Sequence, residues 1–150
     1  MKIYLDADAS PGAVKEILFR ASERLNLPLV LVANTPLKIP RSSTISFVHV
    51  PAGFDEADDR IAGMVEDGDL VITDDVPLAD RVVSGGGFVI TTRGKLYTRD
   101  NIKERLVMRD LMEELRGSGI DTGGPAPFSQ RDRGAFAACL DRFLSGRAGR

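Results

Sequence analysis

Aspartates recur where the apolar runs of this sequence end. The first run closes in YLDADASP, which places Asp6 and Asp8 two positions apart, and a later run closes in VITDD, with Asp74 and Asp75. In an open α/β sheet, ligands bind beyond the carboxyl ends of the strands, where the strand order reverses. If the two runs are neighbouring strands, Asp6 therefore meets Asp74 and Asp75 at one charged site.

A third acidic segment, GFDEADDRI, carries Asp55 and Asp58 one helical turn apart. Carboxylates that gather at one place repel each other, and the pKa of each rises unless a cation compensates. A site made of oxygen ligands without His or Cys suits a hard ion such as Mg²⁺ or Mn²⁺. The pattern therefore predicts a divalent-metal site, and helix capping by the same acids is the alternative explanation.

Two enzyme classes use carboxylates arranged in this way. DADAS followed by VITDD resembles the haloacid dehalogenase pattern, which implies that Asp6 attacks a phosphate and that Asp8 is the acid. Pro11 opens the next helix at once, however, and leaves no room for the flap that these phosphatases insert after the first strand. The phosphatase is therefore the second hypothesis.

The other class is that of the PIN-like nucleases. In these the first strand ends in an Asp after two apolar residues, here YLD, and a later strand ends in T-x-D-x-x-L, here TDDVPL with Thr73 at its start. This match favours Asp75 over Asp74 as a ligand, and the best match for the third acid is Asp58. The resemblance implies that Asp6, Asp58 and Asp75 hold the metal ion.

Several longer motifs extend the resemblance over residues 2–145. They are DADASP, LVAN, GFDEADDRI, DLVITDDVPLA, MRD and SGIDTGGPAPFSQRDR. These motifs resemble the YaiI/YqxD family of small bacterial proteins, which is grouped by fold with the PIN-like domains. The resemblance implies a PIN-like, doubly wound α/β fold and no established reaction. Relatives commonly read Asp-Ala-Cys-Pro where this chain has Ser10, so thiol chemistry is not required there.

The composition describes one ordinary domain. The chain has 150 residues, 43% of them hydrophobic and 28% charged, which is enough for a buried core. Cys139 is the only cysteine, which excludes an internal disulfide, and its apolar neighbours at helical spacing place it in the core. No apolar run approaches the roughly 20 residues of a membrane span, and MKIYLDAD is not a signal peptide. We therefore expect a cytoplasmic protein with no membrane contact.

Strand and helix patterns alternate along the chain. Continuous apolar runs predict buried strands at residues 2–5, 28–34, 45–50, 69–73 and 88–91. Apolar spacing predicts helices at residues 11–25, 54–67, 76–84, 101–116 and from 130 onward, before a short disordered tail. The capping signals are Ser10 before Pro11 in the first of these helices, and Asn101 with Glu104 as a capping box in the fourth. This alternation predicts a doubly wound, mostly parallel sheet with helices on both faces and a helical last third.

The last part of the chain is basic and suits phosphate binding. Residues 1–90 carry 8 Lys and Arg against 14 Asp and Glu, whereas residues 91–150 carry 12 against 8. An acidic part joined to a basic part suits a metal centre beside an anion-binding surface. Some of the arginines have a simpler explanation as partners of nearby acids. The candidate substrate-binding residues are Asn34, Thr73, Arg93, Arg105, Arg109, Arg131 and Arg133.

These features together predict a nuclease. Asp6, Asp58 and Asp75 would hold Mg²⁺ or Mn²⁺ for phosphodiester hydrolysis of RNA, with Asp8 as an outer ligand or general base. A small phosphatase is the enzymatic alternative, and a metal- or nucleic-acid-binding regulatory module is the non-catalytic one. The sequence shows no aromatic stripe suited to base stacking, which counts against a pure single-strand binder. It leaves open RNA versus DNA, the oligomeric state, and whether Asp55, Asp59 or Asp74 joins the site.

Overall fold

Six strands form one sheet in the computed structural model, which describes residues 1–124 and 126–148. Their order is β3-β2-β1-β4-β5-β6; the first five run parallel, and β6 is antiparallel to β5. The predicted parallel sheet is confirmed, but β6 was not predicted because two residues are too few to show a periodicity. The strands are β1 (Ile3–Asp6), β2 (Leu29–Ala33), β3 (Ile45–His49), β4 (Leu70–Ile72), β5 (Phe88–Ile90) and β6 (Leu96–Tyr97).

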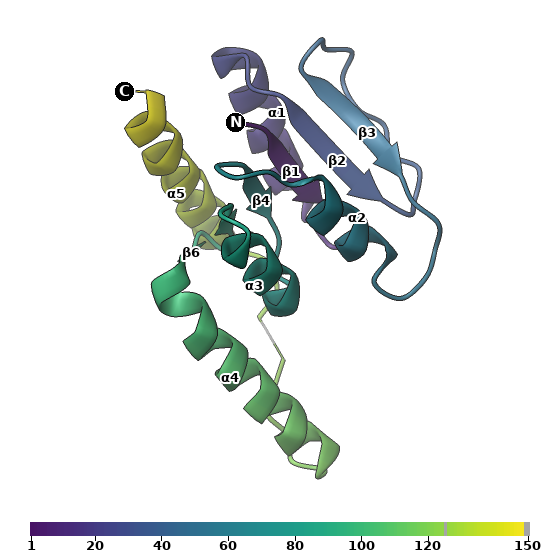
Figure 1. Cartoon of the computed structure of the whole chain (residues 1–150), viewed down its shortest axis with the longest axis vertical. Coiled ribbons are helices and arrows are strands. Elements are labelled where there is room, and N and C mark those ends of the chain that lie inside the picture. The colour runs from purple at the N-terminus through teal and green to yellow at the C-terminus, as the bar shows by residue number, and fades with distance from the viewer. Residues whose placement is uncertain (125, 149–150) are drawn as a thin grey trace.

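Five helices surround this sheet within the described ranges. They are α1 (Gly12–Leu25), α2 (Glu56–Met64), α3 (Val76–Ser84), α4 (Arg99–Gly117) and α5 (Gln130–Ala148). The predicted helical last third is confirmed by α4 and α5 (Figure 1). The end of the predicted disordered tail, residues 149–150, lies outside the described residues.

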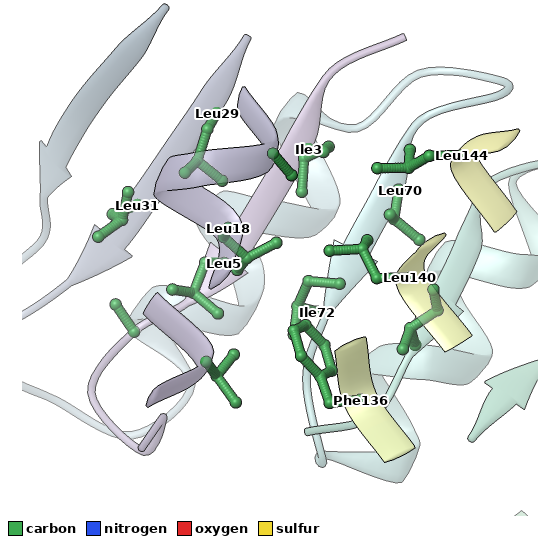
Figure 2. Close-up of a cluster of buried hydrophobic side chains, with 14 of the residues drawn as sticks. Ile3, Leu5, Leu18, Leu29, Leu31, Leu70, Ile72, Phe136, Leu140 and Leu144 are labelled. Atoms are coloured by element: carbon green, nitrogen blue, oxygen red, sulfur yellow. The ribbon is translucent and has the colours of Figure 1, made fainter. Parts of the chain in front are cut away.

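One face of the sheet packs against α1 and α5. The side chains of Ile3, Leu5 and Ile72 point toward these two helices and meet Leu18 of α1 and Phe136 of α5 (Figure 2). All five are fully buried. More buried residues lie on this face of the sheet than on the opposite face, so this layer contains the larger part of the core. The cysteine of α5 lies in the same cluster, which confirms its prediction as a core thiol, and burial raises its pKa.

The opposite face packs against α2 and α3. The side chain of Tyr4 lies between those of Ile3 and Leu5 along β1 and points to the other side of the sheet, where it joins a second cluster with Ile61 of α2 and Leu78 of α3. Helices on both faces explain why the strands are apolar throughout and do not alternate with polar residues. The prediction of a doubly wound sheet is therefore confirmed.

The crossovers leave β1 and β4 as neighbours at the point where the winding reverses. From β1 the chain passes through α1 on one face to β2, and from β4 it passes through α3 on the other face to β5. The connections after β1 and β4 therefore diverge at the carboxyl ends of these two strands, which is the place where open α/β sheets bind their ligands. Asp6 ends β1 and Thr73 follows β4 at this place.

Two helix starts differ from their predicted caps. The Ser10 hydroxyl does not cap α1 but donates to the carbonyl oxygen of Asp6 at 2.8 Å, and Pro11 is the N-cap residue. The capping box of α4 is formed by Thr98 and Asn101, whose side-chain oxygen accepts from the Thr98 N–H at 2.8 Å. Asn101 was predicted to begin this box and instead closes it.

The outer part of α4 extends away from the sheet (Figure 1). Ile102 is its only buried residue, whereas Val107 is 68% exposed and Leu111 is 47% exposed. Most of its basic residues are also exposed, and Arg109 is half-buried. No helix in the described part of the chain is both long and apolar enough to cross a membrane.

Candidate functional site

Thr73 joins the ends of β1 and β4. Its hydroxyl donates to Oδ2 of Asp6 at 3.1 Å and accepts from the backbone N–H of Asp75 at 3.1 Å. Thr73 is buried, so its hydroxyl is fixed in this bridging position. Burial raises the pKa of Asp6, and the nearby charges of Asp75, Asp8 and Asp74 raise it further, although the Thr73 hydrogen bond acts in the opposite direction. The predicted meeting of the two strand ends is confirmed.

Asp58 reaches the same place from α2. Its pKa is raised to about 7, first by loss of water around the carboxyl group and then by the charges of Asp75, Asp6 and Asp55. A hydrogen bond between the carboxyl groups of Asp58 and Asp75 contributes to the rise. Three acids from three separate segments thus interact electrostatically, and we call Asp6, Asp58 and Asp75 the carboxylate cluster.

Asp75 both caps a helix and belongs to the cluster. Its Oδ1 accepts from the backbone N–H of Leu78 at 2.8 Å and so caps the start of α3. The same carboxyl group interacts with Asp58. The capping explanation is therefore correct for Asp75, but it accounts for only part of what this side chain does.

The cluster provides the right donor atoms for a hard divalent cation. Within residues 1–124 and 126–148, no group of three or more acidic, His or Cys side chains is already arranged to hold a metal ion. Mg²⁺ does not need such a cage, because it is usually held by one or two carboxylates together with waters and substrate phosphates. The oxygen-only donors of the cluster, and the mutual repulsion of its carboxylates, which a cation would relieve, fit this mode of binding.

Asp8 faces the turn after β2. Its two carboxylate oxygens accept from the backbone N–H groups of Asn34 at 2.8 Å and Thr35 at 3.3 Å. The Asn34 side chain accepts from the Thr35 hydroxyl at 3.1 Å, and His49 contacts the Asn34 carbonyl oxygen at 3.0 Å. Asp8 and Asn34 therefore lie at the carboxyl edge, as predicted, and both stabilise the turn there.

Of the three acids left open by the sequence, two bind other residues. Asp74 accepts from the backbone N–H and hydroxyl of Thr92 at 2.8 and 2.6 Å, which ties the end of β4 to the segment after β5. Asp59 forms an ion pair with Arg81 at 2.8 Å on the exposed side of α2 and α3. Asp55 precedes α2, and its charge acts on Asp58.

Arg93 mainly anchors the segment before α5. It forms an ion pair with Asp132 at 2.7 Å, donates to the carbonyl oxygen of Ala126 at 2.5 Å and lies 5.9 Å from the ring centre of Phe128. The following residue, Gly94, has a φ of 85°, and a Cβ there would collide with the backbone of α5. The Arg93 turn is therefore a packing site, although its side chain also borders a cleft.

That cleft has a volume of about 540 Å³ and a basic wall. Arg93, Lys95 and Arg105 line it together with Asp74, which places it beside the carboxyl ends of β4 and β5. Lys95 lies over the ring of Tyr97 at 6.0 Å. We call this space the basic cleft, and it is the feature that best suits phosphate groups next to the carboxylate cluster.

The remaining predicted arginines lie outside the lining of the basic cleft. Arg109 forms ion pairs with Asp110 at 3.2 Å and Glu113 at 2.8 Å along α4, which is the pairing that its neighbours suggested. Arg131 and Arg133 lie in the first turn of α5. The pKa of Asp132 is lowered mainly by the hydrogen bond from the Ser129 backbone N–H, and the charge of Arg131 contributes to the lowering. The structure therefore groups Arg93 and Arg105 but not the other three.

A family model described as "Uncharacterized BCR, YaiI/YqxD family" matches residues 4–146. The chain belongs to the YaiI/YqxD family. Relatives named UPF0178 protein include one from Alkalilimnicola ehrlichii, 57% identical over 97% of this chain and 98% of its own length. Those from Halorhodospira halophila and Cronobacter sakazakii are 56% and 54% identical, each over 98% of this chain and 97% of their own length. No solved structure matches.

The family assignment covers the carboxylate cluster and the basic cleft of this YaiI/YqxD protein. The predicted membership is thereby confirmed, while kinship with the PIN-like nucleases stays a prediction. Sequence reasoning missed Thr92 and Phe54. Thr92 lies in TTRGK, a turn-like segment whose charges carry no periodicity, and only the fold shows that it meets Asp74. Phe54 was missed because its exposure depends on the loop conformation.

The raised pKa of Asp58 predicts an unusual pH dependence of the stability of this YaiI/YqxD protein. The pKa of Asp58 lies near 7 in the folded chain, above its ordinary value of 3.8, so the folded state holds more protons between these values. In EDTA the free energy of unfolding should therefore fall as the pH rises from about 4 to 7, on the order of 1–2 kcal/mol after allowance for solvent screening. Urea unfolding at a series of pH values measures this.

Asp58→Asn is the matched variant for the pH experiment. An amide does not titrate, so the slope attributable to Asp58 should disappear. The variant should also be more stable than wild type at pH 8. At that pH the Asp58 carboxylate is charged and repels Asp75, Asp6 and Asp55, and the amide removes this repulsion. Equal slopes in the two proteins would show that Asp58 does not hold a proton in the cluster.

Proposed function

We propose that this protein is a divalent-metal-dependent nuclease that hydrolyses phosphodiester bonds, with RNA as the preferred substrate. The observation that carries the proposal is the carboxylate cluster at the point where the sheet winding reverses. Its acids come from three segments, and loss of water around Asp58 together with the charges of the other acids raises its pKa to about 7. Such a strong perturbation at the carboxyl ends of the strands is typical of a functional site and is costly for a purely structural one.

Each group has a defined part in this proposal. Asp6, Asp58 and Asp75 hold Mg²⁺ or Mn²⁺, and when bound the ion activates a water and neutralises charge on the phosphate. Thr73 orients Asp6 through its hydrogen bond to Oδ2. Arg105 and Lys95 in the basic cleft bind phosphates on either side of the reacting one.

Asp8 has a positioning part rather than a chemical one. Both of its oxygens accept from backbone N–H groups, of Asn34 and Thr35, and so hold the turn after β2. A phosphatase of the haloacid type would need this side chain as a proton donor. The contacts of Asp8 therefore favour the nuclease over the phosphatase.

The proposal agrees with the PIN-like pattern of the sequence. That pattern requires the first and fourth strands to be adjacent and the middle helix to turn an acid toward them, and β1, β4 and α2 meet this requirement. The agreement supports the function but is an analogy, because folds of one type perform several reactions. The one cysteine of the sequence is a buried free thiol, which suits action in the reducing cytoplasm.

A substrate panel tests the proposal. The purified chain is incubated with end-labelled single-stranded RNA, duplex RNA, single-stranded DNA and p-nitrophenyl phosphate, each in Mn²⁺, Mg²⁺ and EDTA. We expect cleavage of oligonucleotides in either metal, fastest for RNA, with none in EDTA. Asp6→Asn, purified in parallel, controls for contaminating nucleases. Hydrolysis of p-nitrophenyl phosphate alone would identify a phosphatase, and binding without cleavage would identify a regulatory module.

A further inference from the structure

Phe54 is the exposed exception among the phenylalanines of this chain. It is 95% exposed, whereas the other six are buried or half-buried. Burying an aromatic ring is one of the larger favourable contributions available to a fold, and here the fold leaves it unused. The ring is therefore available to something outside the chain.

The ring stands on an anchored connection at the functional edge of the sheet. Residues 50–55 join β3 to α2, and Figure 1 shows this connection beyond the arrowhead of β3, at the carboxyl edge. Val50 at one end is buried, and at the other end the Asp59 N–H donates to the Asp55 carbonyl oxygen at 2.8 Å. The segment that carries Phe54 is thus held on both sides.

The ring is also close to the carboxylate cluster. At full extension the Cα atoms of Phe54 and Asp58 can be separated by no more than about 14 Å, and α2 begins between them, which shortens the path. Asp55 lies between the ring and the helix in a left-handed conformation, with φ of 60°, and its charge acts on Asp58. A polymer whose backbone crosses the cluster therefore passes within reach of the ring.

We propose that Phe54 stacks on a base of a single-stranded nucleic acid whose backbone lies on the carboxylate cluster. This inference rests on the proposed nuclease function and adds the form of the substrate, an unpaired strand. Bases of an unpaired strand can stack on an aromatic ring of a protein. Every base has such a face, so stacking tolerates any sequence. It also supplies affinity that does not depend on charge, next to acids that repel phosphate.

A single tryptophan provides the direct test. The chain contains no Trp, so Phe54→Trp places the only indole at the proposed stacking position. Stopped-flow mixing in Mn²⁺ reads its fluorescence before a strand is cut. We expect quenching by 12-nucleotide single-stranded RNA and DNA, and little quenching by an abasic DNA of the same length and charge. Val107→Trp, at a 68% exposed position on α4, is the matched control and should not respond.

Phe54→Ala measures the contribution of the ring to affinity. Loss of one stacked base should weaken binding of RNA or DNA by about tenfold and leave binding of the abasic strand unchanged. Phe54→Tyr keeps an aromatic face and should bind like wild type. Because the ring is exposed, the melting temperature of each variant should stay within about 2 °C of wild type, which separates lost stacking from lost folding.

The results separate this inference from the proposed function. If wild type cleaves oligonucleotides while Phe54→Ala binds and cleaves them as well as wild type does, the stacking is wrong and the nuclease stands. If Phe54→Trp is quenched but no strand is ever cut, the stacking stands and the nuclease is wrong. Equal quenching by the abasic strand, or no binding of any strand, overturns the stacking. Quenching by only RNA or only DNA supports it and identifies the sugar.

Discussion

Exchange of Asp58 for asparagine is expected to lower the rate of Mn²⁺-dependent oligonucleotide cleavage about a hundredfold or more. The isosteric amide removes one of three carboxylates that face each other, and with it the negative charge that attracts the cation. Asp6→Asn should cause a loss of similar size. Because the acids act on one ion, the double variant should be little worse than either single variant. Initial rates on a labelled RNA strand measure all three.

Asp59→Asn is the matched control for this experiment. Asp59 is the next residue on the same helix, but it is exposed and forms an ion pair with Arg81. An exposed pair of this kind contributes little to stability, so the variant should fold normally and cleave within about twofold of wild type. A loss as large as that of Asp58→Asn would mean that α2 is disturbed as a whole, and the role of the cluster would have to be abandoned.

Asp8→Asn distinguishes the two enzyme classes. A phosphatase of the haloacid type needs Asp8 as its acid and Asp6 as a nucleophile that becomes phosphorylated. The nuclease needs Asp8 only for the turn at Asn34, where the single amide oxygen of asparagine can still accept from one of the two backbone N–H groups. We therefore expect a modest loss of activity. Full activity in Asp58→Asn together with none in Asp8→Asn would establish the phosphatase.

The sheet and the ends of its strands could be predicted because they follow from local patterns. Apolar runs such as those ending at Asp6 and Asp74 indicate buried strands, and the helices between them require parallel pairing. Once the strands are placed, the carboxyl edge and the acids on it follow. β6 escaped prediction because two residues contain no pattern, and its pairing with β5 depends on the Arg93 turn.

The division of tasks among the charged residues could not be predicted. Arg93 was a candidate phosphate ligand, and its partner Asp132 lies 39 positions away, a distance over which no local pattern operates. Arg109 forms ion pairs with residues one and four positions away, and this alternative was visible in the sequence. Asp75 shows the limit of choosing between explanations, because it caps α3 and joins the cluster at the same time.

Mn²⁺ is expected to raise the melting temperature of the protein. A cation that binds only the folded state stabilises it by RT ln(1 + [L]/Kd), which is about 2.7 kcal/mol when the ion is at a hundredfold excess over Kd. For a chain of this size that corresponds to a shift of about 5 °C or more. Thermal unfolding in EDTA and in millimolar Mn²⁺ or Mg²⁺ measures the shift. The pH should be near 8, where Asp58 has released its proton and does not compete with the ion.

Asp6→Asn makes the thermal experiment specific to the cluster. In EDTA the variant should melt at or above the temperature of wild type, because one repelling charge is gone, and in Mn²⁺ it should gain little. Acids that only cap helices would give the reverse pattern, a modest loss on mutation and no response to metal. Asp59→Asn, whose carboxylate is paired with Arg81, should keep the full wild-type shift. A flat response of wild type to both ions would leave the cluster without a metal and the proposed hydrolysis without its catalyst.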